Sequence, residues 1–192
     1  CDRTVPGMLI FTSGTLTTGA NTLTLGAAAS LVGAGAGRYV HGNLARVIPK
    51  TLTVPAVFAI GDATNYAPVE VAFGTVSTEG TLTASTAVPG GAPAAGDPPA
   101  GSGISQSRYV DRSWTLTNSG TSPLGFDTYA ATLHFVGGDV RGGGDYNNFI
   151  VARNTGGTWS NPAVSDPLAT SITATGLTEP GEFRVGEPGG TA

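Results

Sequence analysis

Turn residues interrupt this chain so often that no long helix fits between them. Glycine or proline recurs almost every ten residues, and the 192 residues include 30 glycines and 13 prolines. The segments between them are short, rich in threonine and valine, and lack the i, i+3, i+4, i+7 spacing of an amphipathic helix. Short runs of this kind between turns are typical of antiparallel sandwiches and barrels. We therefore expect an all-β fold, an antiparallel β-sandwich of the jelly-roll or immunoglobulin-like kind.

Apolar and polar positions alternate within several of these runs. Such alternation predicts a strand with one face in the core. Trp114 alternates with Leu116 in one run, so we expect its indole in the core. The TLT run at 15–17 and the TLTL run at 22–25 are too close for solenoid coils, which need about 20 residues each, so we expect a hairpin there. The clearest alternating segments are 69–73, 82–88, 113–117 and 129–135.

A segment without any strand pattern divides the chain into halves of similar length. Residues 89–103 read PGGAPAAGDPPAGSG, without an aromatic residue or apolar periodicity, which is typical of a long flexible loop or linker. Each half is long enough to form a small sandwich of its own. Both tryptophans, Trp114 and Trp159, lie in the second half, so the first half lacks a large aromatic centre. We therefore favour one domain over residues 1–192 with a long surface loop.

The charge and hydropathy of the chain argue against two kinds of partner. Charged residues make up 11% of the sequence, and the nine basic residues are scattered, Lys50 being the single lysine. Nucleic-acid binding requires clustered Lys and Arg, so we expect no nucleic-acid partner. No apolar run approaches the roughly 20 residues that span a bilayer, so we expect no transmembrane segment.

Residue types used in catalysis are scarce. The only histidines, His41 and His134, are 93 positions apart in expected strands, whereas a metal site needs three or four converging ligands. No Gly-x-Ser-x-Gly elbow occurs that would accompany a catalytic triad. We therefore expect no enzymatic activity, no cofactor, and a structural or surface role for both histidines.

One glycine-rich loop carries residue types that bind calcium. Asp139, Asp145 and Asn147 lie in GGDVRGGGDYNN, and their oxygens are of the kind that Ca²⁺ prefers. The loop lacks EF-hand spacing, and we favour a solvated hairpin with Asx turns over a calcium site. Asp62 with Asn65 presents the same two alternatives.

Cys1 is the only cysteine and cannot form an internal disulfide. A mature chain that begins with cysteine is what lipoprotein processing leaves, so lipidation at Cys1 is one interpretation. A chain boundary and a reactive or intermolecular thiol are the alternatives.

Residues 1–12 are expected to form a polar tether followed by an assembly strand. Met8, Leu9, Ile10 and Phe11 are consecutive large apolar residues, and such a run is expected to be buried on both faces or to fill a groove between sheets. The low charge leaves sheet edges with little protection against pairing with another chain. A strand donated to a neighbour's sheet, repeated head to tail, builds a filament.

Five segments resemble modules of large secreted surface proteins of the Bacteroidetes type. They read ANTLTLGAAASLVGAGAGRYVHGNLAR, FAIGDATNYAPVEVAF, RSWTLTNSG, GDVRGG…YNNFIVARNTGGTW and ATGLTEPGEFRVGEP, and together extend from about Gly19 to Glu187. The resemblance implies export, a β-sandwich, and a structural or adhesive setting. It implies no catalytic residues.

Two functions are therefore expected. The first is an extracellular or cell-surface structural protein that polymerises with itself into a filament by β-strand addition. The alternative is a monomeric adhesion or carbohydrate-binding module, which needs exposed aromatic rings that stack on glycans. The aromatic candidates are Tyr39, Tyr66, Tyr109, Tyr129, Tyr146, Trp114 and Trp159.

Overall fold

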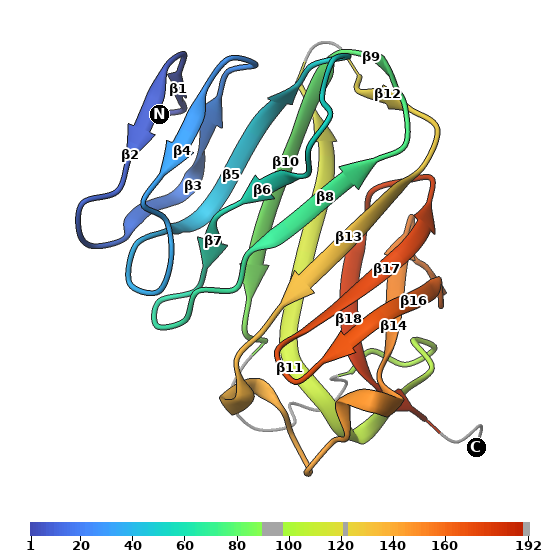
Figure 1. Cartoon of the computed structure of the whole chain (residues 1–192). Coiled ribbons are helices and arrows are strands. Elements are labelled where there is room, and N and C mark those ends of the chain that lie inside the picture. Colours follow the sequence, from blue (N-terminus) through green and yellow to red (C-terminus); the bar gives the residue numbers. More distant parts are fainter. Residues whose placement is uncertain (90–97, 121–122, 190–192) are drawn as a thin grey trace.

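Two large β-sheets face each other as the layers of a sandwich, and two small sheets lie beside them (Figure 1). The computed structural model describes residues 1–89, 98–120 and 123–189, and it confirms the all-β prediction. The helical segments in these ranges are the single 3-10 turns η1 (Gly137–Asp139) and η2 (Tyr146–Asn148). No helix in the described ranges is long and apolar enough to cross a membrane.

The strands are distributed over four sheets. The nine-stranded sheet contains, in spatial order, β1 (Arg3–Val5), β3 (Leu16–Leu25), β5 (Val40–Ile48), β10 (Gly80–Ala87), β11 (Ile104–Ser119), β18 (Glu182–Pro188), β14 (Ile150–Thr155) and β15 (Thr158–Ser160), with β7 (Ile60–Gly61) beside β5. The five-stranded sheet contains β16 (Ala163–Leu168), β17 (Ser171–Leu177), β13 (Tyr129–His134), β8 (Val69–Phe73) and β6 (Ala56–Phe58). The small sheets pair β2 (Met8–Ile10) with β4 (Ser30–Val32), and β9 (Val76–Thr78) with β12 (Gly125–Phe126).

The core lies between the large sheets and follows the predicted alternation. In β10, Leu82 and Ala84 are buried, whereas Thr81 and Thr83 between and beside them are only half-buried. Trp114 in β11 is the largest fully buried side chain, as its place in an alternating run predicts. Each fully buried large aliphatic side chain contributes roughly 1.5–3 kcal/mol, so the inward faces of these strands are the main source of stability.

The N-terminal strands wind as a coil of parallel strands. Arg3 in β1 lies opposite Leu23 in β3, which in turn lies opposite Leu44 in β5. Met8 in β2 lies opposite Ser30 in β4, and across all these parallel pairs partner residues are 20 to 24 positions apart. Parallel strands need crossover connections, and here each crossover passes through a strand of the β2–β4 sheet. The large sheet is therefore mixed, and the expected antiparallel pairing is found in the strand pairs from β10 onward.

Residues 15–25 do not form the predicted hairpin. Residues 16–25 form one strand, β3, with a register shift between Thr17 and Thr22 where it pairs with β5. Inside this bulge the backbone N–H of Asn43 donates to Thr18 Oγ1 at 2.9 Å. Gly42 faces the bulge with φ 123°, and a Cβ there would collide with Thr18 Oγ1. The hairpin prediction is wrong because the repeated TLT marks the two ends of one bulged strand.

The predicted loop at 89–103 falls partly outside the described residues, which resume at Pro98. The carbonyl of Pro98 accepts a hydrogen bond from Gln106 Nε2 at 2.6 Å, and the carbonyl of Ser102 accepts one from Asn161 Nδ2 at 3.0 Å. Ser102 is only 1% exposed. The end of the segment is thus an anchored turn. Both large sheets contain strands from before and after the segment, so the two halves of the chain share one core.

Candidate functional site

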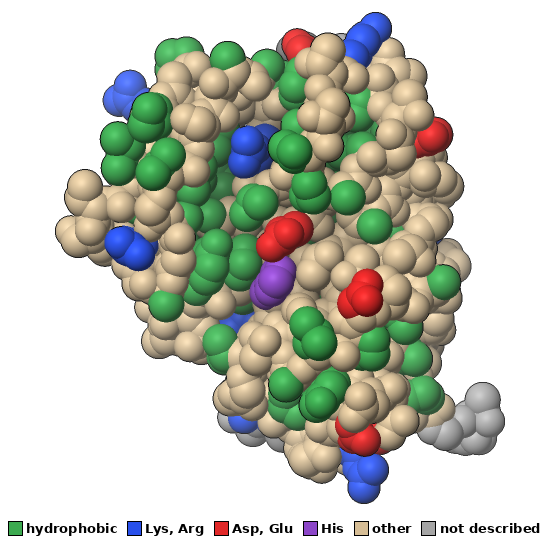
Figure 2. Space-filling model, viewed as in Figure 1, with side chains coloured by type: hydrophobic (Ala, Val, Ile, Leu, Met, Phe, Trp, Pro, Cys, Tyr) green, Lys and Arg blue, Asp and Glu red, His purple; other side chains and the backbone are tan. Residues whose placement is uncertain are grey.

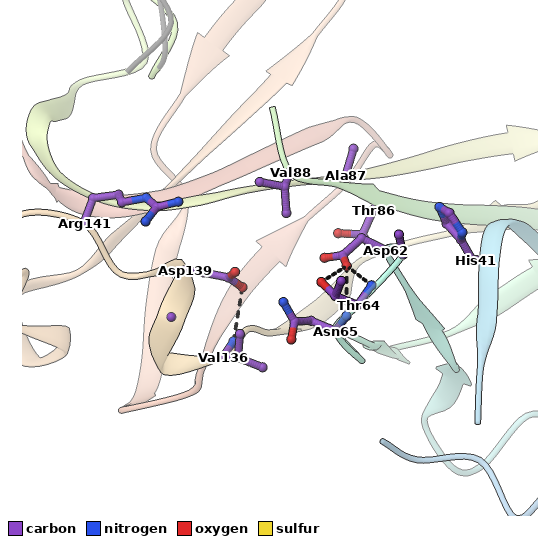
Figure 3. A pocket seen from close by; sticks show the side chains of 12 residues that line it. His41, Asp62, Thr64, Asn65, Thr86, Ala87, Val88, Val136, Asp139 and Arg141 are labelled. Atoms are coloured by element: carbon purple, nitrogen blue, oxygen red, sulfur yellow. Dashed lines mark hydrogen bonds between the residues drawn. The ribbon is translucent and has the colours of Figure 1, made fainter. Parts of the chain in front are cut away.

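A cavity of about 710 Å³ lies where the start of β5 and the end of β10 meet two loops, the one after β7 and the one that contains η1 (Figure 3). The loop after β7 contributes Asp62 and Asn65, and the η1 turn contributes Asp139. In Figure 3 these side chains and Val88 surround one central space. The polar side chains that line the cavity are His41, Asp62, Thr64, Asn65, Thr86, Asp139 and Arg141.

A buried arginine holds the two acidic sides of this cavity together. The Arg112 side chain is fully buried, and its Nη2 donates to Asp62 Oδ2 at 2.6 Å. Its Nε donates to Asp139 Oδ2 at 2.8 Å, and its Nη1 donates to Thr86 Oγ1 at 3.4 Å. A buried guanidinium is tolerated because ionised partners and hydrogen bonds compensate its lost hydration. The two loops and β10 are thereby fixed relative to one another.

A bulge in β11 brings Arg112 to this position. Val110 pairs with Val185 of β18, and Trp114 pairs with Phe183, so more residues of β11 than of β18 lie between these pairs. The regular alternation is lost, and residues 109–112 are all buried. Asp111 lies in the same bulge, and its Oδ2 accepts a hydrogen bond from Arg141 Nη2 at 2.6 Å. β-Bulges commonly re-aim side chains in this way.

Asp62 is held by a tight Asx turn. Its Oδ1 accepts from the backbone N–H of Thr64 at 2.7 Å, from the Thr64 hydroxyl at 2.9 Å, and from the backbone N–H of Asn65 at 2.8 Å. Burial favours the neutral carboxyl, but these hydrogen bonds and the one from Arg112 outweigh it and lower the pKa of Asp62 to about 2. Asp62 is therefore a carboxylate at neutral pH. Of the two interpretations of Asp62 with Asn65, the structure contains the Asx turn.

The calcium alternative, which the sequence analysis did not favour, requires Asp139, Asp145 and Asn147 in one site, and the structure gives them different partners. Asp139 is buried and accepts from Arg112 and from the backbone N–H of Val136 at 3.2 Å. Asp145 is the N-cap residue of η2. Its side chain accepts hydrogen bonds from both the backbone N–H and the side-chain amide of Asn147. Among the described residues, no three His, Cys, Asp or Glu side chains are grouped to hold a metal ion. The loop is therefore held in place by the ion pair between Arg112 and Asp139 and by the Asx turn of Asp145 with Asn147.

The histidines belong to different regions. His41 lines the cavity, whereas His134 in β13 lies with its Nε2 3.2 Å from Glu70 Oε1.

The seven aromatic candidates do not form an exposed platform. Tyr39, Tyr109, Tyr129 and Trp114 are at most 3% exposed, and Tyr66 and Trp159 are half-buried. Tyr146 is the exposed one of the seven, at 37%. Sugar stacking on these rings is therefore limited to partly covered faces.

The N-terminal run is not buried on both faces, which corrects the prediction for residues 8–11. Met8 and Ile10 are 60% and 58% exposed, whereas Leu9 packs against the core and Phe11 is buried. The run alternates because β2 lies at the end of the sandwich, with core on one side and solvent on the other. Met8, Ile10 and the neighbouring Val32 in β4, 47% exposed, form an apolar patch that we name the N-terminal patch. Figure 2 shows apolar side chains gathered over β2 and β4, at the upper left.

The two ends of the sandwich differ in how their edges are protected. Within the described chain, β1 pairs on one side with β3 and β2 pairs on one side with β4, so both have an open edge. At the opposite end, β16 contains Pro167, a register shift between Ser165 and Leu168, and Asp166 at φ 50°. Proline, bulges and charge are devices that prevent edge pairing. At the N-terminal edge, β1 contains one charged residue, Arg3, whereas β2 contains neither a proline nor a charge, and Cys1 lies exposed beside this edge.

Arg112, Asp111 and Thr86 are not among the candidate residues predicted from the sequence. One feature of the sequence points to the two charged ones: Asp111 and Arg112 stand directly before the alternating run at 113–117, in a chain with only nine basic residues. A charged pair beside a core strand indicates a buried ion pair, but its partners are not identifiable from the sequence. In comparisons with known proteins, no family model, curated protein or solved structure matches this chain.

Proposed function

We propose that this chain is an extracellular structural module that assembles with copies of itself by β-strand addition at the β1–β2 edge. The observation that carries the proposal is the N-terminal patch together with the two open strand edges. Unpaired edges next to an exposed apolar face are templates for pairing with another chain.

The inward-facing residues of the same strands suggest how subunits are joined. Leu9 and Phe11 pack against the core of their own chain. If residues 1–12 exchange between copies, the same contacts form between subunits, as in domain swapping. Head-to-tail exchange leaves one site open on each end of the assembly and therefore produces a filament. The resemblance to secreted surface modules supports an extracellular or cell-surface setting.

Sedimentation velocity over a concentration series tests this proposal. The unmodified chain is expected to form species larger than the monomer, and the double variant Met8→Thr/Ile10→Thr is expected to remain monomeric. Val54→Thr is the matched control, because Val54 is 65% exposed and lies outside the patch. An unmodified chain that stays monomeric at its highest soluble concentration, or a double variant that assembles equally well, would contradict the proposal.

A monomeric carbohydrate-binding or adhesion module is the second candidate. The cavity favours it, because hydrogen-bonding groups from several elements and apolar side chains line one concave site. This candidate does not need the β1–β2 edge, so the two functions are separable by variants at the two places.

A further inference from the structure

We infer that the cavity between Asp62 and Asp139 binds a small neutral ligand rich in hydroxyl groups, of the size of a mono- or disaccharide. Its volume, about 710 Å³, falls within the range of roughly 300–1,000 Å³ that is usual for small-molecule sites. The inference does not depend on assembly at the N-terminal edge.

The acidic sides of the cavity are rigid hydrogen-bond acceptors. Within the part of the chain that the structure describes, Asp62 Oδ2 accepts one hydrogen bond, from Arg112, and Asp139 Oδ1 accepts a single long one of 3.3 Å from the same guanidinium. A carboxylate oxygen can accept at least two, so each of these atoms retains capacity toward the cavity. Since Arg112 fixes both carboxylates before a ligand arrives, little ordering cost remains on binding.

The balance of charge disfavours an anionic ligand. Asp62, Asp139 and Asp111 carry three negative charges, and Arg112 and Arg141 carry two positive ones. Both guanidinium groups are already paired with carboxylates at 2.6–2.8 Å. The site therefore offers no unpaired positive charge to a phosphate or carboxylate. Its acceptors suit hydroxyl donors, which bring no charge that must be desolvated.

The rim of the cavity contains polar side chains that form no hydrogen bond with the described residues of the protein. Within the described residues, neither the His41 ring nor the side-chain amide of Asn65 makes a hydrogen bond, although both line the cavity. An amide donates and accepts at once, as does a neutral imidazole, which matches the dual character of a hydroxyl group. Val88 and Val136 add apolar surface for the C–H faces of a sugar ring. In Figure 3 the amide of Asn65 points into the space between Asp62 and Asp139.

Calorimetric titration with defined probes tests the inference. The neutral probes are glucose, galactose, N-acetylglucosamine, maltose, cellobiose and lactose, and the charged probes are inorganic phosphate and spermidine. At least one neutral saccharide is expected to bind with 1:1 stoichiometry. Asn65→Ala is expected to weaken it about three- to tenfold, the effect of one hydrogen bond.

Controls separate loss of the site from loss of the fold. Asn148→Ala is the matched control, because Asn148 is exposed, lies outside the cavity and makes no side-chain hydrogen bond within the described residues. Circular dichroism of each variant checks folding, and His41→Ala provides a second rim variant. The inference is overturned if no neutral saccharide binds at tens of millimolar, if both rim variants bind as the unmodified chain does, or if only phosphate or spermidine binds. The Met8→Thr/Ile10→Thr variant retains the cavity, so failure of assembly and failure of binding are distinguishable.

Discussion

Arg112 shows how one residue can organise a loop region. It is fully buried, yet three groups from three separate elements meet its guanidinium: Asp62, Thr86 and Asp139. Removing one partner from a buried charge pair is costly, because the remaining charges stay buried without compensation. The same side chain therefore contributes to stability and to the shape of the cavity.

Replacing Arg112 by Met is expected to lower the free energy of unfolding by about 3–5 kcal/mol, since Asp62 and Asp139 lose their shared counter-ion. Arg108→Met is the matched control. The Arg108 side chain is 57% exposed and lies 3.4 Å from Glu187, and an exposed pair contributes about 0–1 kcal/mol. Urea denaturation measures both. Equal losses for the two variants would show that the Arg112 pairs do not stabilise the fold.

The lowered pKa of Asp62 makes a specific contribution to acid sensitivity. Its pKa is about 2 in the folded chain and about 3.9 when unfolded, so its stabilisation is complete above about pH 4 and lost as the pH falls towards 2. Asp62→Asn cannot titrate, and its unfolding free energy is expected to fall less steeply over this interval. Denaturation series between pH 2 and 5 compare the slopes, and parallel curves would contradict the assignment.

Among the single elements, β2 shows that buried and exposed side chains alternate along a strand even where every residue of the run is apolar. Leu9 and Phe11 face the core, whereas Met8 and Ile10 face solvent. Strand geometry turns successive side chains to opposite faces, whatever their chemistry. Met8 and Ile10 therefore form part of the protein surface and add little to the core, although both side chains are apolar.

Phe11→Ala is expected to destabilise the chain by about 3–5 kcal/mol, because it removes a buried ring. Ile10→Ala is expected to change stability by about 0.5 kcal/mol or less, because that side chain is 58% exposed. Thermal and chemical denaturation at a concentration where the protein is monomeric measures the difference. A large loss for Ile10→Ala in the monomer would mean that β2 is seated with the opposite face inward.

Across the molecule, both large sheets contain strands from both halves of the chain, and the halves meet at one strand pair in each sheet, β10 with β11 and β8 with β13. β10 and β11 form a continuous antiparallel ladder from Thr81 opposite Ser119 to Ala87 opposite Ser113. The two halves are therefore held together by backbone hydrogen bonds and by the common core, and not only by the connecting segment.

A protease site introduced between residues 90 and 97 is expected to leave the cleaved protein folded. The β10–β11 ladder and the shared core keep the two fragments associated. Size-exclusion chromatography in native buffer should recover both fragments in one peak, with a melting temperature within a few degrees of the intact chain. A cut beside Ser102 is the comparison, and it is expected to cost more because Ser102 is buried and bonded to Asn161. Separation of the fragments after the first cut would contradict the shared core.

The features that depend on local geometry were predictable from the order of residues. Short strands between turn residues, the inward positions of Leu82 and Ala84, and the burial of Trp114 follow from a two-residue period that each strand expresses on its own. An apolar side chain at an inward position is buried whichever strand lies beside it.

Which strands pair and which charged side chains meet became known from the folded chain. The parallel coil of β1, β3 and β5 joins residues 20 to 24 positions apart, and nothing in the local pattern distinguishes it from a hairpin. Arg112 meets Asp139 and Asp62 across 27 and 50 positions, through a bulge that local alternation does not predict. Pairing partners and buried ion pairs depend on competition among long-range arrangements that satisfy the same local pattern equally well, so the folded chain alone selects between them.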